Sequence, residues 1–352
     1  MNAPFTHSAA QIRTAQVDQP GEADRIAAWA ARNGGTIFHM PAWLAAVEAG
    51  TGQQALGLIA ERGGELAGWL PLTLVHSPVF GRALVSSGFA VEGGALADSA
   101  TTAHALCAAV EELAQRHSCA SVELRGGLAP GNWSVHSDTH AIFRKELAEG
   151  DEELLLAIPR KQRAEVRKGL ASDLEMSIGT AEADRAAHYA VYSESVRNLG
   201  TPVFPRSLFD AVLDRLDADI LTIRGGGVPV ASVLSLYHDG AVLPYWGGGT
   251  PAARRLRAND RMYFELMLHA RRRGCTTFDF GRSKTGSGAF AFKRNWGFEP
   301  EPLHYTSWTA PGRAPRDANP ESAHHAARIA MWKRLPLAVT NRLGPVIARG
   351  LG

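Results

Sequence analysis

The chain has 352 residues, of which 45% are hydrophobic and 20% are charged, a composition typical of a globular protein long enough for two domains. The formal net charge of +2 is too small to indicate a nucleic-acid partner by itself. Three cysteines without a CxxC pair exclude a disulfide framework and fit a reducing compartment.

The two ends of the chain differ in character. Residues 1–20 are polar and lack the apolar stretch of a signal peptide, and no run approaches the roughly 20 apolar residues of a membrane-spanning helix. Residues 1–150 carry 9 basic and 14 acidic residues, whereas residues 312–352 carry 7 basic and 2 acidic ones. We therefore expect a cytoplasmic protein with a basic C-terminal tail.

The first half of the sequence predicts a mixture of helices and strands. Leu106, Val110 and Leu113 have helical spacing and predict a helix over residues 101–118. Two apolar runs on either side of Gly63-Gly64 have the form of a β-hairpin. The other predicted elements are helices over residues 23–33 and 41–49 and strands over residues 56–61, 65–75, 120–125 and 141–147.

A strongly charged segment, residues 151–170, marks the middle of the chain. Acidic residues open it and basic residues close it, which suits the helix dipole, and Pro159 divides it into two helices. We place a domain boundary here, with domains over residues 1–150 and 151–311 and a tail over residues 312–352.

The second half repeats the order of elements found in the first. Asn259 is expected to cap the start of a helix over residues 260–272, and Gly274 its end. The repeated order of hairpin, strand, helix and strand indicates a duplicated architecture. The other predicted elements are helices over residues 183–198 and 205–216 and strands over residues 220–224, 228–237, 241–246 and 276–280.

The densest cluster of chemistry lies in residues 278–298, FDFGRSKTGSGAFAFKRNWGF. A predicted strand enters a loop whose glycines, including Gly286, would let the backbone approach a ligand closely. Arg282, Lys284 and Lys293 would face phosphates or a developing oxyanion, and Ser283 adds a hydroxyl. The alternative is a flexible surface loop with solvated charges.

Several named chemistries are absent from the sequence. There is no GxxxxGK[ST], GxSxG, HExxH or GxGxxG motif, which argues against P-loop, hydrolase, zinc-protease and dinucleotide sites. The 13 histidines are scattered, and His324-His325 is their one adjacent pair. We therefore expect no metal site.

The strings quoted above, together with PRKQRAEVRKGL, NLGTP and PYWGGGT, resemble Fem-type transferases and their GNAT relatives. The resemblance covers residues 150–305 well and the first half mainly through TIFHMPAWLAAVEA and GWLPLTLV. The FemAB-like proteins associated with exosortase/PEP-CTERM systems are the subgroup it resembles in particular. It implies an α/β (α+β) fold with two tandem GNAT-like domains, each a mixed central sheet flanked by helices.

The resemblance also implies an enzyme that moves an acyl or aminoacyl group to an amine, in exopolysaccharide or cell-envelope biosynthesis. The coiled-coil insertion of some Fem proteins and the (R/Q)xxGx(G/A) loop of GNAT enzymes are both missing. The donor therefore stays open between acyl-CoA, acyl carrier protein and aminoacyl-tRNA, with no tightly bound cofactor. Nucleic acid is a partner only if tRNA is the donor.

Three residues are the catalytic candidates. Lys293 matches the Fem lysine near the reacting carbonyl and would stabilise the oxyanion. Tyr245 is the candidate acid for the leaving group, or a packing aromatic beside Trp246. Asp279 matches the DFG aspartate and would orient a cation or hold the loop. Candidates for donor or substrate binding are Arg282, Ser283, Lys284, Gly286, Arg160, Lys161, Arg163, Arg167 and Asn259.

The tail mixes apolar side chains such as Trp332 and Leu335 with basic ones, so it could lie on the inner face of a membrane. Pro336 and Pro345 are expected to break any long helix there. Two rival hypotheses remain for the whole protein. One is a non-catalytic GNAT-fold protein that binds a glycan or partner, and the other is a tRNA-dependent transferase of the peptidoglycan type.

Overall fold

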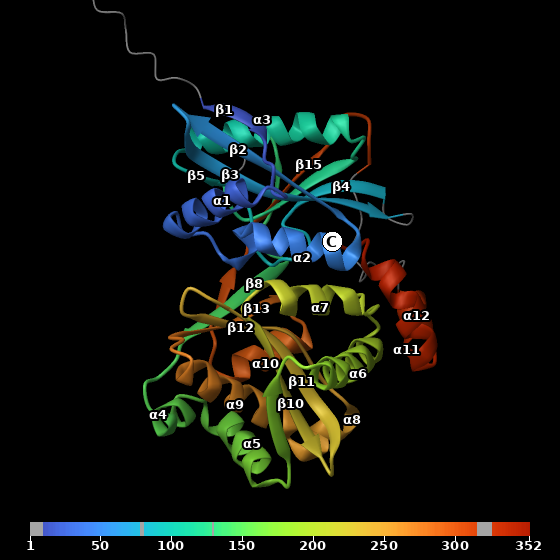
Figure 1. Cartoon of the computed structure of the whole chain (residues 1–352). Coiled ribbons are helices and arrows are strands. Elements are labelled where there is room, and N and C mark those ends of the chain that lie inside the picture. Colours follow the sequence, from blue (N-terminus) through green and yellow to red (C-terminus); the bar gives the residue numbers. More distant parts are fainter. Residues whose placement is uncertain (1–9, 78–80, 129, 315–325) are drawn as a thin grey trace, which may run out of the picture. The chain divides into compact units, whose positions relative to one another are not determined.

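A computed structural model of the chain describes residues 10–77, 81–128, 130–314 and 326–352. The chain forms two compact units that alternate along the sequence (Figure 1). The first unit contains Met1–His136, His304–Ala318 and Gly350–Gly352. The second contains Ser137–Leu303 and Asn319–Arg349. The part of the predicted tail over residues 315–325 lies outside the described residues.

The first unit is built on a mixed sheet in the order β1-β2-β3-β4-β6-β15-β7, with β5 paired to β3. Helix α3 packs on one face against β2 and β3, and α1 and α2 pack on the other. Alternation along β2 sends Leu58 toward α3 and Ile59 toward α1 and α2. The elements are β1 Gln11–Thr14, α1 Pro20–Arg32, the 3₁₀ turn Ile37–His39, α2 Pro41–Thr51, β2 Gln54–Arg62, β3 Glu65–Ser77, β4 Gly81–Ser86, β5 Leu96–Ala97, α3 Ala100–Arg116, β6 Ser121–Arg125, β7 Ser134–His136 and β15 Tyr305–Thr309.

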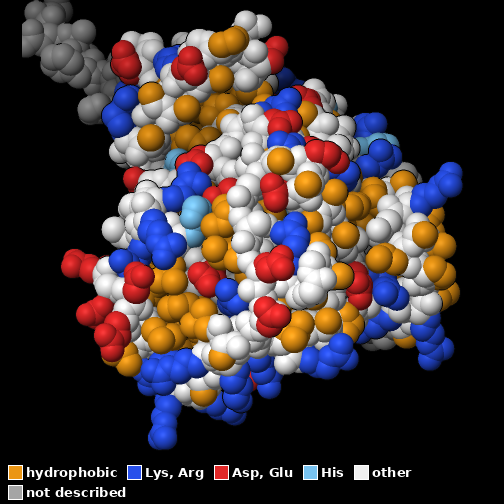
Figure 2. All heavy atoms as spheres, turned by 60° about the horizontal axis from the view of Figure 1, so that its bottom comes forward, with side chains coloured by type: hydrophobic (Ala, Val, Ile, Leu, Met, Phe, Trp, Pro, Cys, Tyr) orange, Lys and Arg blue, Asp and Glu red, His pale blue; other side chains and the backbone are white. Residues whose placement is uncertain are grey.

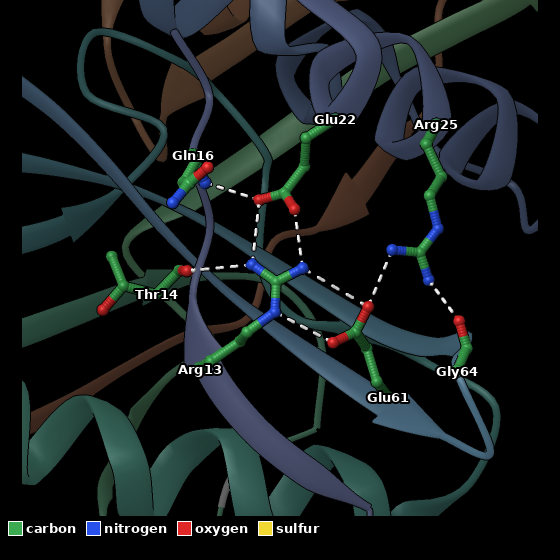
Figure 3. A network of polar contacts seen from close by, with 7 residues as sticks. All are labelled: Arg13, Thr14, Gln16, Glu22, Arg25, Glu61 and Gly64. Carbon is green, nitrogen blue, oxygen red and sulfur yellow. Dashed lines mark hydrogen bonds and ion pairs between the residues drawn. The ribbon is translucent and has the colours of Figure 1, made fainter. Parts of the chain in front are cut away.

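A network of charges ties β1 and α1 to β2 at the edge of the first sheet (Figure 3). The Arg13 guanidinium contacts Glu22 at 2.6 Å and Glu61 at 2.9 Å, and Arg25 contacts Glu61 at 2.7 Å. These hydrogen bonds to Arg13 hold the pKa of both glutamates below their ordinary values. Because the arginines are well exposed, each pair contributes little stability, and the network mainly fixes the geometry of the edge.

The second unit is built on a mixed sheet in the order β14-β8-β13-β12-β11-β10-β9. Helices α5, α8 and α9 cover one face, and α6 and α7 cover the other. The elements are β8 His140–Glu146, α4 Asp151–Leu156, α5 Arg160–Ala171, β9 Glu175–Gly179, α6 Glu182–Leu199, α7 Arg206–Arg215, β10 Ala218–Gly225, β11 Val228–His238, β12 Ala241–Gly249, α8 Pro251–Leu256, α9 Ala258–Arg272, β13 Thr277–Lys284, α10 Gly288–Asn295, β14 Pro300–Pro302, α11 Ala326–Arg334 and α12 Leu337–Ala348.

The two sheets share one topology. In each, three antiparallel strands lead into a helix and then into a strand that runs parallel to the third: β2-β3-β4, α3 and β6 in the first unit, and β10-β11-β12, α9 and β13 in the second. The duplicated order predicted from the sequence is therefore present. The next strand of each sheet comes from elsewhere, since β15 pairs with β6 and β8 pairs with β13.

The structure corrects two local predictions. Asn259 does not cap α9, because the helix begins at Ala258 with Arg257 as its N-cap in the left-handed region. Pro345 lies inside α12 rather than ending a helix. Pro336 does separate α11 from α12. No helix among the described residues is long and apolar enough to cross a membrane.

Candidate active site

The site begins at a bulge in β13. Asp279 pairs with Arg144 of β8, and Arg282 pairs with Ile142, so two residues of β13 stand opposite one of β8. Gly281, one of the two residues opposite Phe143, has a φ of +67°, which a residue with a Cβ adopts only at a cost. The carbonyls of Gly281 and Arg282 lie at this bulge and directly after it.

Asp279 holds this bulge in shape. One of its carboxylate oxygens accepts the Gly281 N–H at 2.7 Å, and the other accepts the Arg144 Nε–H at 2.8 Å. The carboxylate is buried, and charge-assisted bonds of this kind are among the stronger ones in proteins. Of the two roles considered for Asp279, its contacts match the structural one, which is to fix the backbone that Lys293 contacts.

Lys293 of α10 contacts these two backbone carbonyls directly. Its Nζ donates to Gly281 O at 3.0 Å and to Arg282 O at 2.9 Å. The side chain is 9% exposed, and Nζ lies 5.4 Å and 5.8 Å from the ring centroids of Phe143 and Phe280. An ammonium has three N–H groups, so one remains after these two bonds to donate to another acceptor.

Burial lowers the pKa of Lys293 to about 7, because the charged form loses its hydration in this aromatic surrounding. Asp279 opposes the shift and Arg282 adds to it, both as smaller effects. The amine therefore changes charge near neutral pH. A group of this kind can donate to a developing oxyanion when protonated and can accept a proton when neutral.

A second set of residues lies at the glycine-rich end of β12. Tyr263 of α9 packs edge-on against Phe280, with ring centroids 4.9 Å apart, and a methyl group at Gly247 would lie 3.1 Å from its hydroxyl. A methyl group at Gly249 would lie 2.4 Å from Asn259 Oδ1. That oxygen is buried and has no hydrogen-bond partner among the described residues. Asn259 and Tyr263 are four residues apart and share one face of α9.

Strands β12 and β13 separate beside this site. Their parallel ladder consists of two residue pairs, Ala241–Thr277 and Val242–Phe278, and ends there. The remainder of β12, up to Gly249, pairs with β11 alone. Backbone groups at such an unpaired edge can bind an extended ligand by adding hydrogen bonds to the sheet.

The predicted loop is mostly regular structure. Arg282, Ser283 and Lys284 belong to β13, and residues from Gly288 onward form α10. Gly286, with a φ of +76°, lies in the short turn between them. The helix forms because the Ser287 side chain accepts the Phe290 N–H at 3.2 Å, a standard N-cap that the glycines obscured. The Ser283 hydroxyl is buried without a partner among the described residues.

The other predicted site residues lie on β12 and α5. Tyr245 is half-buried on β12, at the irregularity in its pairing with β11, and its ring lies edge-on to Trp246 with centroids 4.8 Å apart. The predicted cations of α5 face solvent, apart from the half-buried Arg163, which donates to Leu156 O at 3.2 Å. Helix α5 packs against α9, where Gln162 bonds Asp260.

Sequence reasoning missed four residues near this site. Arg144 lies in the strand β8 and gave no motif, although it directly follows the apolar residues 141–143. Tyr263 could have been found from its spacing to Asn259. Arg254 and Arg255 of α8 are exposed and lie in the short helix after the glycines of β12. No group of three His, Cys, Asp or Glu side chains in the described parts of the chain could hold a metal ion.

Residues 160–294 match the family model described as an acetyltransferase (GNAT) domain, and this range contains Lys293, Asp279, Asn259 and Tyr263. This part of the second unit is therefore similar to a GNAT-type acetyltransferase domain. No curated protein matches the sequence.

Solved structures show the same architecture over most of the chain. FemX is 15% identical, with 82% of this chain and 96% of FemX covered and a TM-score of 0.62. A tandem GNAT protein from the clavulanic acid biosynthesis pathway is 13% identical, with 87% and 100% covered and a TM-score of 0.55. L-PGS from Bacillus licheniformis is 12% identical, with 90% and 96% covered and a TM-score of 0.53. At these identities the similarity shows the fold, and the prediction of two tandem GNAT-like domains is confirmed.

Proposed function

We propose that the chain is an N-acyltransferase that moves an acyl or aminoacyl group from an activated donor to an amine, with Lys293 at the reacting carbonyl. The observation that carries this proposal is a buried lysine with a pKa of about 7, held by two carbonyls of a strand bulge. It lies in the part of the second unit that is similar to a GNAT domain. A lysine that only anchored the backbone would not need a degree of burial that disfavours its charge.

The reaction would proceed through a tetrahedral intermediate. The lone pair of a neutral amine attacks the carbonyl carbon of the donor and forms the C–N bond, while the carbonyl oxygen becomes an oxyanion. The remaining N–H of protonated Lys293 donates to that oxyanion. The C–S or C–O bond to the leaving group then breaks and the leaving group takes a proton for which Tyr245 is the candidate donor. The proton released by the amine passes through solvent and restores the Tyr245 hydroxyl.

The donor would lie along the separated strands β12 and β13. Its extended part would bond the free edge of β12, where Gly247 and Gly249 let the backbone pass close to Tyr263 and Asn259 of α9. Its anionic part would reach the cations of α5 and α8, which include Arg160, Lys161 and Arg167. This arrangement serves acyl-CoA, acyl carrier protein or aminoacyl-tRNA, since all three join an activated acyl group to phosphates.

The acceptor we propose is an amine on a glycan or precursor of the cell envelope or an exopolysaccharide. This part of the proposal depends on the FemAB-like strings of the PEP-CTERM-associated subgroup, and L-PGS and FemX have the same fold. Peripheral attachment at the inner face of a membrane would bring the enzyme close to such a precursor.

Donor turnover tests the proposal. The purified protein is incubated with each class of donor and a panel of amino sugars and other amines, and the products are identified by mass spectrometry. We expect one donor class to be consumed, and Lys293→Met to lower the rate at least about 10²-fold. Ribonuclease sensitivity would identify tRNA as the donor.

Two outcomes would reject this mechanism. Unchanged turnover in Lys293→Met would remove Lys293 from the reaction. If no donor is consumed although a glycan still binds, the chain is a GNAT-fold binding protein. Arg116→Met, on α3 of the first unit with its side chain 68% exposed, is the control for the loss of one cation.

A further inference from the structure

The last two helices expose several of their large apolar side chains. The buried residues of α12 are small: Thr340 and Ala348 are at most 1% exposed, and Gly344 is buried. On the other side Leu343 is 47% and Val346 is 56% exposed. An amphipathic helix of a globular protein has the reverse arrangement.

The same outward face continues along α11 and α12. Met331 is 61% exposed and Val339 39% exposed, and with Leu343 and Val346 they recur at intervals of three to eight residues along the helix pair. We call these four residues the apolar face. The right-hand edge of Figure 2, where α11 and α12 lie, shows orange side chains with Lys and Arg among them.

The orientation of the helix pair is fixed by close packing within the second unit. A methyl group at Gly344 would lie 3.0 Å from the backbone nitrogen of Val203. Asn341 contacts the Ser193 hydroxyl of α6 at 3.3 Å. Arg197 of α6 donates to the carbonyl of Leu335, between the helices, at 3.3 Å. The apolar face therefore cannot be buried by a simple rotation of α12.

The charged side chains of this segment have one sign. Lys333, Arg334, Arg342 and Arg349 are exposed, and the sequence has no Asp or Glu after Glu321. Long basic side chains can keep their charge in the headgroup region while their stems lie along the acyl chains. We propose that this face binds the surface of a bilayer that contains anionic phospholipid.

A bilayer fits this surface better than a second copy of the chain does. A symmetric dimer would bring the same cations of each copy together across the interface, with no acidic side chain from this segment to neutralise them. Anionic headgroups complement the cations, and each Lys or Arg near such a surface strengthens binding by roughly fivefold, equivalent to about 1 kcal/mol. Apolar side chains of such a helix enter the headgroup boundary by about 5–10 Å.

Vesicle flotation tests the proposal on the full chain. One set of vesicles contains phosphatidylcholine alone, and the other contains phosphatidylcholine with phosphatidylglycerol. We expect binding to the second set that weakens as salt is added. The double variant Leu343→Ser/Val346→Ser should bind at least about tenfold more weakly. Arg342→Glu/Arg349→Glu should lose the preference for anionic vesicles.

Val228→Ser is the matched control, since Val228 is 62% exposed on β11 of the same unit. It should bind like the wild type. All of these positions are exposed, so thermal unfolding midpoints should stay close together, which excludes misfolding as the cause of weaker binding. Equal binding of wild type and Leu343→Ser/Val346→Ser would overturn the proposal. So would a dimer in light scattering that this variant dissociates, which would make the face an interface between copies.

The membrane proposal does not depend on which donor or acceptor the enzyme uses. A chain without transferase activity could still bind vesicles, and an active enzyme could fail to bind them. The two experiments therefore report on separate properties.

Discussion

At the scale of single residues, burial of the Lys293 ammonium costs free energy, and two hydrogen bonds offset part of that cost. Its ammonium loses hydration among Phe143 and Phe280, and the carbonyls of Gly281 and Arg282 compensate in part. The balance leaves the pKa near 7 instead of its ordinary 10.5. A charge that is disfavoured in the folded state makes stability depend on pH.

The sign of this dependence follows from proton binding. Between pH 7 and 10.5 the unfolded chain holds a proton on Lys293 that the folded chain has released. The free energy of unfolding therefore rises with pH in this window, by about 1.4 kcal/mol per pH unit at most. Below pH 7 the folded state must also carry the charge on Lys293, so the full free-energy cost of burying that charge lowers the stability of the fold. Lys293→Met lacks this contribution.

We therefore expect the stability of Lys293→Met relative to wild type to be greatest near or below pH 7 and to fall as pH rises. Urea unfolding of both proteins from neutral to mildly alkaline pH measures the difference. The loss of two hydrogen bonds shifts the free energy of unfolding of the variant by the same amount at every pH. The test is therefore how the difference between variant and wild type changes with pH. A difference that does not change with pH would contradict the assigned pKa, and exposed Lys168→Met should show no such slope.

Residue types at the site were predictable, but their geometry was not. The segment FDFGRSKTGSG indicated a site because it contains several glycines together with hydroxyl-bearing and cationic side chains. It did not reveal that Asp279 bonds Arg144, since that residue precedes it by 135 positions. Contacts over such distances depend on strand pairing, which single-residue patterns do not specify.

At the scale of elements, the sequence predicted most helices and the hairpins of both units. It did not predict α8, α10, α11 or α12. GSGAFAFKRN reads as a loop because of its glycines, but Gly288 occupies the first turn of α10, where a helix tolerates it after the Ser287 N-cap. PAARRL similarly forms α8, a short helix between the glycines of β12 and α9.

The approach of β12 to α9 gives a prediction at this scale. A Cβ at Gly249 would meet Asn259 Oδ1 at 2.4 Å, so Gly249→Ala must push the strand and helix apart or displace Asn259. We expect a loss of about 1–3 kcal/mol in stability and a larger fractional loss of kcat/KM for the donor. Thermal unfolding and steady-state kinetics measure the two effects.

Gly288→Ala is the matched control for this change. A Cβ at Gly288 meets nothing within 4 Å, its φ is negative, and it lies in α10 beside the same site. Alanine there should keep activity and add up to about 1 kcal/mol of stability. If both alanines have the same effect, the close approach at Gly249 has no functional meaning.

At the scale of the whole molecule, each half of the sequence supplies a strand to the other unit. Strand β8 lies at the end of the first half but pairs with β13 and β14, and β15 lies at the end of the second half but pairs with β6 and β7. The sequence-based boundary between residues 150 and 151 falls after β8, whereas the units change between His136 and Ser137. Composition and periodicity identify a strand but not the sheet it joins.

This exchange predicts that the first unit depends on residues far along the chain. Ser307 lies in the middle of β15, opposite Glu123 of β6 and Ser134 of β7. Ser307→Pro removes a backbone donor from a strand with neighbours on both sides, a position where proline is not tolerated. We expect backbone amides of β6 to lose protection in hydrogen exchange by at least about tenfold.

Strands β10 to β12 should keep their protection in Ser307→Pro, because they belong to the second unit and pair among themselves. Ser307→Ala keeps the backbone N–H and should resemble the wild type at β6. Equal loss of protection in both units would show that they unfold as one cooperative structure. No loss at β6 would mean that β15 is not needed to hold the first sheet. The expected result, a loss confined to the first unit, would show that folding of the N-terminal half requires a strand that lies about 180 residues beyond β6, so an isolated N-terminal fragment would lack part of its own sheet.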